Sequence, residues 1–335
     1  MMFPLSYLLF FFTLFLGISI SISSPSWFNI WVGLELNMIS FIPLITIKMN
    51  SFFSESALKY FLIQALGSTL FILSSCMLLS FPKLSTPFLL SSLFLKLGSA
   101  PFHFWFPQVM MGLTWPQAII LMTFQKIPPM ILISYLSTFS SLTQIIIFSA
   151  ILSAIIGALG GFNTMQLRKI MAFSSINHMS WMLISISMND AFWALYFLFY
   201  AIISSSIIIL FNMYQTFTLS DLMKFNQPIC IYSLLMPLNL LSLGGLPPFA
   251  GFIPKWMLIQ LMINNNLFFP LIFLLSSTLV TLYFYLRITI FFLLLTNPNM
   301  IIFKKLNPTS FALPSNSFMF FNLFMFCFPL MFLLF

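Results

Sequence analysis

Apolar runs long enough to cross a lipid bilayer recur from one end of this chain to the other. A transmembrane helix needs about 20 predominantly apolar residues, and many of the runs here reach that length. Only 5% of the 335 residues are charged, so no segment has the polar surface that a soluble domain of any size needs. The sequence therefore predicts a multi-pass membrane protein without an extramembrane domain.

The same runs predict an all-α fold. Within lipid, backbone polar groups must be paired inside the protein, which leaves only helices and closed barrels. Barrel strands alternate apolar and polar residues, whereas these runs are continuous. Eleven spans are predicted: 5–22, 26–46, 59–80, 85–112, 115–137, 143–163, 168–187, 191–214, 228–264, 267–295 and 316–335.

The fourth and ninth runs are too long for a straight span and contain Gly and Pro, so each is one broken helix or two crossings. If each is a single broken helix, seven of the eight loop bases follow even-numbered spans and therefore lie on one side of the membrane. If each is two crossings, four bases lie on each side. Positive charges gather on the inner side of a membrane, which favours eleven spans with the N-terminus inside and the C-terminus outside. The seven are Lys48, Lys59, Arg168, Lys169, Lys224, Lys304 and Lys305, and the eighth is Lys83.

The two broken runs resemble each other. PFHFWFP covers 101–107 and PFAGFIP covers 248–254, each after a glycine-containing turn. They lie five spans apart, and an odd number of helices in a repeat inverts the second copy, as in many secondary transporters. One membrane domain is predicted, with a first inverted repeat at 5–137, a second at 143–295 and a C-terminal helix at 316–335. Alternatively, the prolines only kink helices.

With the eight loop bases set aside, five charged residues lie well inside the predicted spans: Glu35, Lys96, Lys126, Lys255 and Arg287. Such residues are costly in a bilayer and usually line a water-filled path or pair with one another. Burial disfavours the charged form of a lysine and a nearby carboxylate favours it, which suits a proton relay. A helix break would solvate the lysine with free carbonyls and water. The alternatives are snorkelling for the lysines, a helix-to-helix hydrogen bond for Glu35 and a structural role for Arg287.

The remaining reactive residues give weaker signals. His103 and His178 could bind haem between helices, but their surroundings do not favour it, so both are ranked as minor relay or packing residues. Cys76, Cys230 and Cys327 lack metal-binding spacing and are expected to be buried free thiols. Glu55 and Lys59, four residues apart, predict a surface pair on a helix. The bases are scattered, which argues against nucleic-acid binding.

Five segments, in this order and spacing, resemble one known family. They are GLELNM (33–38), LKLGSAPFHFWFPQV (95–109), LTWPQAIILMTFQKIPP (113–129), MQLRKIMAFSSINHMSWM (165–182) and GGLPPFAGFIPKW (244–256). The family is chain 2 of NADH:ubiquinone oxidoreductase, respiratory complex I, in its animal mitochondrial form. The resemblance covers nearly the whole chain.

This resemblance implies an antiporter-like subunit of the membrane arm that translocates protons within the respiratory chain. The family's relay residues fall on Glu35, Lys96, Lys126 and Lys255. The full antiporter-like fold has fourteen helices, of which this chain would lack the first three. The implied location is the mitochondrial inner membrane, with the N-terminus in the matrix and the C-terminus in the intermembrane space.

The resemblance also implies which chemistry lies elsewhere. This chain has no Gly-rich dinucleotide fingerprint and no cysteine cluster, so no cofactor is expected in it, and flavin, iron–sulfur clusters and ubiquinone are expected on partner subunits. The expected partners are other membrane-arm subunits, including neighbouring antiporter-like ones, and phospholipids. The alternatives are a free-standing monovalent cation/proton antiporter and a passive membrane spacer.

Overall fold

The computed structural model describes residues 5–46, 50–223 and 231–294. Within these residues the regular secondary structure is helical, apart from one isolated bridge between Gln166 and Thr218. The predicted all-α fold is therefore confirmed. The eleventh predicted span, 316–335, lies outside the described residues, so the total of eleven stays a prediction. The chain forms two compact units, 1–153 and 154–335.

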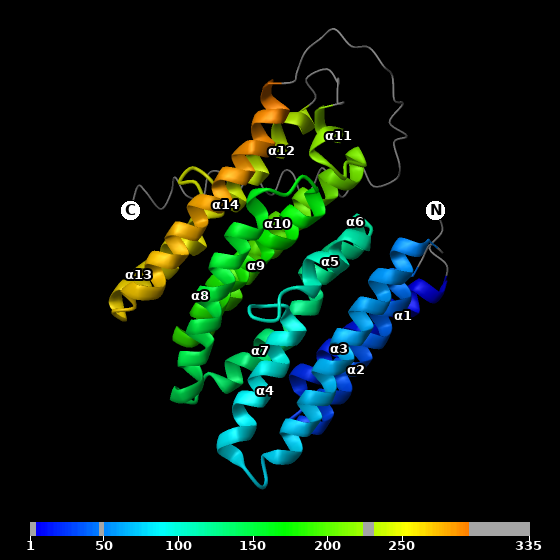
Figure 1. Ribbon diagram of the computed structural model, residues 1–335, viewed down its shortest axis with the longest axis vertical. Coiled ribbons are helices and arrows are strands. Elements are labelled where there is room, and N and C mark those ends of the chain that lie inside the picture. Colours follow the sequence, from blue (N-terminus) through cyan, green and yellow to red (C-terminus); the bar gives the residue numbers. More distant parts are fainter. Residues whose placement is uncertain (1–4, 47–49, 224–230, 295–335) are drawn as a thin grey trace. The chain divides into compact units, whose positions relative to one another are not determined.

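The first unit follows the predicted spans closely (Figure 1). The third span differs, because its helix begins eight residues earlier than the predicted 59 and so includes Glu55, which pairs with Lys59 one turn later. The elements are α1 (Leu5–Ser23), α2 (Trp27–Ile45), α3 (Ser51–Met77), α4 (Pro82–Leu97), α5 (Trp105–Gly112), α6 (Trp115–Met122), the 3-10 turn η1 (Phe124–Lys126) and α7 (Ile127–Leu136). Helix α8 (Ser140–Phe162) continues into the second unit.

The fourth predicted span is a broken helix. Figure 1 shows α4 and α5 continuing in one direction, opposite to that of α3, with the non-helical segment 98–104 between them. Gly98 ends α4 in the left-handed conformation, with φ of 71°, and its backbone N–H bonds to Phe94 O and Leu95 O. Glycine suits this position because it has no Cβ to clash.

The fifth predicted span is also interrupted, which its apolar pattern did not predict. Helix α6 ends at Met122, η1 follows, and α7 begins at Ile127 with two prolines in its first turn. Proline has no backbone N–H to donate to the preceding turn, so Pro128 and Pro129 separate η1 from a regular helical ladder.

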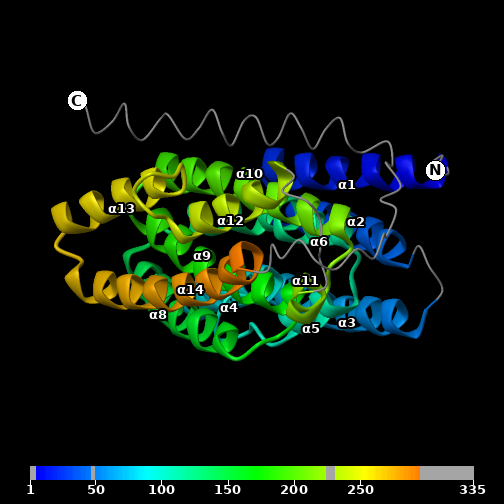
Figure 2. The ribbon, with the colours of Figure 1, turned by 90° about the horizontal axis from the view of Figure 1, so that it is seen from above.

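The second unit contains the ninth predicted span as a second broken helix. Helices α12 and α13 continue in one direction on either side of segment 245–251, and α14 returns beside them (Figures 1 and 2). Gly245 ends α12 with φ of 77°. The elements after α8 are α9 (Leu167–Met188), α10 (Asp190–Tyr214), α11 (Leu219–Met223), α12 (Ile231–Gly244), α13 (Phe252–Asn264) and α14 (Phe268–Leu294).

Seven helices in the described part of the chain are long and apolar enough to cross a membrane. Three predicted spans are missing from these seven: the two broken ones, whose halves are short, and α9. Helix α9 carries Ser174, Ser175, Asn177 and His178 as buried residues, which lower its hydropathy. A buried helix in a bundle can hold polar side chains because its neighbours supply hydrogen-bond partners.

Close helix contacts recur in the two units at matching positions. A Cβ on Gly17 of α1 would lie 2.8 Å from the backbone nitrogen of Asn37 in α2, and one on Gly157 of α8 would lie 2.7 Å from that of Asn177 in α9. Each second-unit residue lies 140 positions after its first-unit counterpart. These matches support an internal repeat, while its inverted arrangement and its predicted bounds stay predictions.

Candidate functional site

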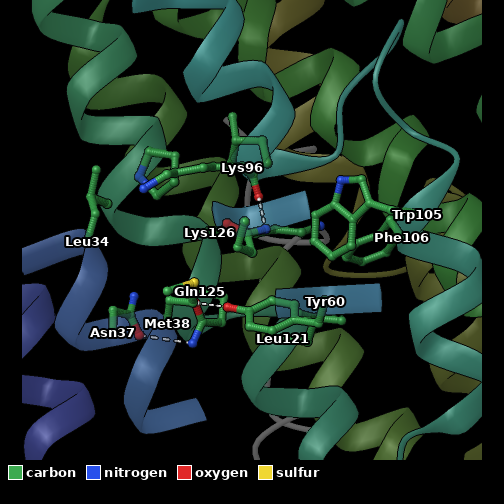
Figure 3. Close-up of a pocket in the computed structure, with 13 residues that line it drawn as sticks. Leu34, Asn37, Met38, Tyr60, Lys96, Trp105, Phe106, Leu121, Gln125 and Lys126 are labelled. Carbon is green, nitrogen blue, oxygen red and sulfur yellow. Dashed lines mark hydrogen bonds between the residues drawn. The ribbon is translucent and has the colours of Figure 1, made fainter. Parts of the chain in front are cut away.

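A small cavity in the first unit lies beside the first helix break, and Lys96 and Lys126 both line it (Figure 3). It leaves about 20 Å³ for the centres of water molecules, which is above the roughly 10–15 Å³ that one water requires. The side chains of Lys96 and Lys126 are buried, at 8% and 2% exposure. The other polar residues of its lining are Asn37, Tyr60, Gln64 and Gln125, with the indole of Trp105.

Lys96 occupies the last turn of α4, where the helix leaves carbonyls without helical partners. Two neutral side chains bond these carbonyls: Trp105 Nε1 donates to Leu95 O at 3.0 Å, and Gln64 Nε2 donates to Lys96 O at 3.3 Å. Gly67 of α3 makes room for the lysine stem, since a Cβ there would lie 3.1 Å from Lys96 Cγ. The break thus holds the lysine beside the cavity while its own backbone is satisfied.

Lys126 ends the 3-10 turn between α6 and α7. Its Nζ lies 5.0 Å from the centre of the Phe106 ring, within the range of a cation–π contact. Phe106 belongs to α5, directly after the break. The interruption of the fifth span therefore directs its lysine to the same cavity that Lys96 lines.

A chain of hydrogen bonds crosses one side of this cavity (Figure 3). Tyr60 OH donates to Gln125 Oε1 at 3.1 Å, and Gln125 Nε2 donates to Asn37 Oδ1 at 2.9 Å. These three residues were not predicted from the sequence, although GLELNM and TFQKIPP contain two of them near predicted relay residues.

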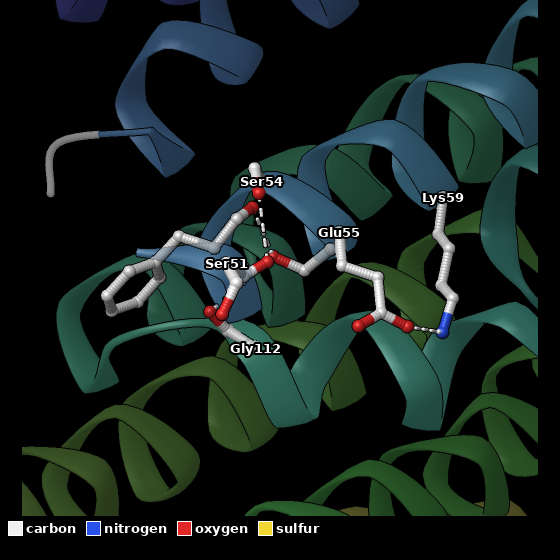
Figure 4. A network of polar contacts seen from close by, with 7 residues as sticks. Ser51, Ser54, Glu55, Lys59 and Gly112 are labelled. Atoms are coloured by element: carbon white, nitrogen blue, oxygen red, sulfur yellow. Dashed lines mark hydrogen bonds and ion pairs between the residues drawn. The ribbon is translucent and has the colours of Figure 1, made fainter. Parts of the chain in front are cut away.

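Glu35 is partly exposed on α2 and is not part of the cavity lining. Its charge acts on Lys96 and Tyr60, but the Glu35 carboxylate and the Lys96 amine form no ion pair within 4.0 Å in the described structure. By contrast, the predicted surface pair is confirmed: Glu55 Oε1 and Lys59 Nζ are 2.6 Å apart on the exposed start of α3 (Figure 4).

Lys255, in the second unit, caps the second helix break directly. Its Nζ donates to Leu243 O at 3.3 Å and to Gly244 O at 2.8 Å, the last carbonyls of α12. The side chain lies against Gly245, where a Cβ would come within 2.7 Å of Lys255 Cδ. The predicted solvation of a lysine by the carbonyls of a break therefore occurs at Lys255.

His178 lies beside the second break. Its Nδ1 is 2.9 Å from Tyr196 OH, and it lines a cavity with Tyr200, Ser242 and Gly251. This cavity leaves about 10 Å³ for water centres, at the lower limit for one water molecule. The structure thus places His178 in a polar site of the second unit next to the break that Lys255 caps.

The other two minor candidates lie apart from both cavities. His103 lies in the first break, where its Nδ1 donates to Pro101 O at 3.3 Å and its ring packs on Phe104. Arg287 donates to Phe162 O at 3.5 Å and contacts Met165 Sδ at 2.8 Å, at the end of α8. These contacts favour a structural role for Arg287.

The predicted burial of Cys76 is wrong, because α3 presents it as an exposed free thiol. A thiol is apolar enough to face outward from a hydrophobic helix at little cost. Cys230 and Cys327 lie outside the described residues. In the part of the chain that the structure describes, no group of three or more His, Cys, Asp or Glu residues could hold a metal ion.

Comparison with known proteins decides the family. A family model described as NADH:quinone oxidoreductase/Mrp antiporter, TM, matches residues 24–86 and 82–281. NADH-ubiquinone oxidoreductase chain 2 of Anopheles gambiae is 46% identical over 285 residues, which are 82% of each chain. This chain belongs to the NADH-ubiquinone oxidoreductase chain 2 family. The Aedes aegypti member is 46% identical over 290 residues, 84% of each chain.

A solved structure shows the fold that the chain 2 family shares. A chain of respiratory complex I from Thermus thermophilus, determined with bound aureothin, superposes with a TM-score of 0.83 at 22% identity. The match covers 97% of this chain and 78% of the other. The resemblance of the five sequence segments to the chain 2 family is therefore confirmed, and the all-α architecture is that of a complex I membrane chain.

Proposed function

We propose that this chain is a proton-translocating, antiporter-like subunit in the membrane arm of respiratory complex I, in the mitochondrial inner membrane. Its family supports this role, and one observation carries it: two buried lysines, Lys96 and Lys126, line one water-sized cavity beside a broken helix. Charged side chains buried in a membrane protein generally serve ion or proton paths. The chain therefore contributes to proton pumping, while NADH oxidation by ubiquinone takes place on partner subunits.

In the proposed relay, Glu35 controls Lys96. A carboxylate favours the charged form of a nearby lysine, and burial disfavours it. Glu35 already acts on Lys96 without direct contact, so movement of α2 toward or away from α4 changes whether Lys96 keeps its proton. Lys126, across the shared cavity, receives that proton through water, and the relay continues to Lys255 in the second unit.

The partners follow from this role. Other membrane-arm subunits, including neighbouring antiporter-like ones, flank the chain, and phospholipids cover its remaining outer surface. The redox groups, namely flavin, iron–sulfur clusters and ubiquinone, belong to partner subunits. The bias of the loop bases places the N-terminus in the matrix and the C-terminus in the intermembrane space.

Two measurements test the proposal. The first is a native gel of gently solubilised membranes, stained for NADH oxidation, in which mass spectrometry should find this chain in the large NADH-oxidising band. The second compares assembled complexes with and without Lys96→Met. Proton pumping should fall at least tenfold while assembly stays normal, since methionine keeps the shape of the stem without the proton. Normal pumping by Lys96→Met in a fully assembled complex would remove the basis of the relay.

A second candidate is a free-standing monovalent cation/proton antiporter, which the family model's description as NADH:quinone oxidoreductase/Mrp antiporter favours. Such a protein would exchange ions when reconstituted alone in liposomes. A complex I subunit would be inactive there, because its energy comes from its partners. Ion exchange by the isolated chain would therefore replace the first proposal with the second.

A further inference from the structure

The Gln125 side chain joins three separate elements at the wall of the first cavity. Its amide donates to Asn37 of α2 and accepts from Tyr60 of α3, while its backbone forms the middle of η1 (Figure 3). Asn37 and Tyr60 are both buried, at 3% and 1% exposure. A buried polar group that loses its partner carries the full cost of its desolvation, so these bonds hold the Gln125 side chain in one place.

The backbone around Gln125 has little regular support of its own. The turn η1 is three residues long, and Pro128 and Pro129 cannot donate to the carbonyls that precede them. Across this turn, Lys126 N bonds to Thr123 O and Ile127 N bonds to Phe124 O, and before it Thr123 N bonds to Ile119 O. The position of Lys126 therefore depends on side-chain links, and Gln125 supplies two of them from the adjacent residue.

The second unit provides an internal comparison. Asn177, 140 residues after Asn37, also bonds to a neighbouring helix, α14. Ser277 Oγ donates to Asn177 Oδ1 at 3.0 Å, and Asn177 Nδ2 donates to Thr281 Oγ1 at 3.4 Å. Both partners lie within the continuous helix α14, and neither adjoins a lysine. The link to this asparagine thus recurs, but only in the first unit does it run through a turn that carries a relay candidate.

We infer that Gln125 is a positioning residue for Lys126, which it holds at the cavity and couples through Asn37 to α2, the helix that carries Glu35. This inference rests on the proposed relay. Asn37 lies two residues after Glu35, so movement of α2 displaces both the carboxylate and the anchor of Gln125. The same motion then reaches Lys96 through charge and Lys126 through a hydrogen bond.

The test is Gln125→Met in the assembled complex, which preserves the length of the side chain but removes both hydrogen bonds. We expect the rate of proton pumping to fall roughly three- to tenfold, as the loss of one or two buried bonds would give. The pH dependence of pumping should also shift, since Lys126 no longer keeps its place. Assembly, and electron transfer from NADH to an artificial acceptor, should be unchanged. Tyr60→Phe, which removes one of the two bonds, should shift the pH dependence in the same direction by less.

Ser277→Ala is the matched control, because it breaks a bond of the equivalent link in the second unit at a residue whose neighbours along the chain are not titratable. It should leave the pH dependence of pumping unchanged. The inference is overturned if Gln125→Met pumps normally, or if both variants lose pumping equally with no shift in pH dependence. If Gln125→Met does not assemble, Tyr60→Phe decides, and an unshifted profile overturns the inference. Lys126→Met separates the two ideas: normal pumping by that variant refutes the relay, whereas loss of pumping there with a normal Gln125→Met refutes only the inference.

Discussion

The two helix breaks share one geometry and differ in what binds their carbonyls. Gly98 and Gly245, 147 residues apart, end α4 and α12 in the same left-handed conformation. At the first break, neutral side chains of Gln64 and Trp105 donate to the last carbonyls. At the second, the amine of Lys255 does so itself.

This difference separates two uses of a buried lysine. Both amines lie near the C-terminal end of a half-helix, where partial negative charge favours a cation. Lys255 is bonded to that end, so it stabilises the break in addition to its proposed role in the relay. The backbone near Lys96 is satisfied without its amine, which leaves the amine available to the cavity and to Glu35. In the proposed relay, the first break therefore serves proton transfer alone, and the second combines transfer with structural support.

The largest expected effect of this comparison is on assembly. Lys255→Met removes two hydrogen bonds and leaves Leu243 O and Gly244 O without this donor, at about 1–3 kcal/mol for each buried group. We expect less assembled complex and a lower thermal midpoint, together with loss of pumping. Lys96→Met should lose pumping alone. Native gels measure the amount of assembled complex, and thermal unfolding measures its midpoint, for both variants. Equal assembly and equal midpoints would show that Lys255 has no structural role.

A smaller effect is expected at the glycines. Alanine in the left-handed conformation costs about 1–2 kcal/mol, so Gly98→Ala and Gly245→Ala both strain the backbone. At Gly245 the new Cβ also meets Lys255 Cδ at 2.7 Å, whereas at Gly98 the nearest atom is Phe106 Cβ at 3.1 Å. Gly245→Ala should therefore lower pumping more than Gly98→Ala, because it displaces Lys255 of the proposed relay. Equal losses of pumping in the two variants would mean that backbone strain alone causes the effect.

Trp105→Phe should make the first break resemble the second. It keeps the aromatic contact but removes the donor to Leu95 O, which becomes an acceptor available to the Lys96 amine. We expect a severalfold fall in pumping, corresponding to about 1 kcal/mol for one hydrogen bond, with assembly retained. A structure of the variant complex should show the Lys96 amine nearer the carbonyls. Unchanged pumping would indicate that the neutral donors do not matter for Lys96.

The sequence predicted both helix breaks but not the side chains that bond to the carbonyls there. Apolar length located the spans, Gly and Pro located both breaks, and isolated charges identified Lys96, Lys126 and Lys255. Gln64, Trp105 and Gln125 were missed because a glutamine or tryptophan within an apolar run usually reads as a packing residue. Their importance depends on which carbonyl or amide lies opposite, and that is set by tertiary packing between helices far apart in sequence. The interruption at Lys126 was not predicted because residues 115–137 have the length of one straight span, although TFQKIPP interrupts their apolar pattern.

The smallest expected effect is at an exposed lysine, which lies away from both helix breaks. Glu55 and Lys59 form their pair at 2.6 Å with side chains 62% and 40% exposed. Exposed pairs of this kind contribute about 0.3–0.5 kcal/mol and are screened by salt. Lys59→Met should therefore leave pumping and assembly within measurement error, in contrast to the same substitution at Lys96 or Lys255. If Lys59→Met reduced pumping as much as Lys96→Met, then removal of any lysine would be enough, and burial beside a broken helix would not be what distinguishes the relay residues.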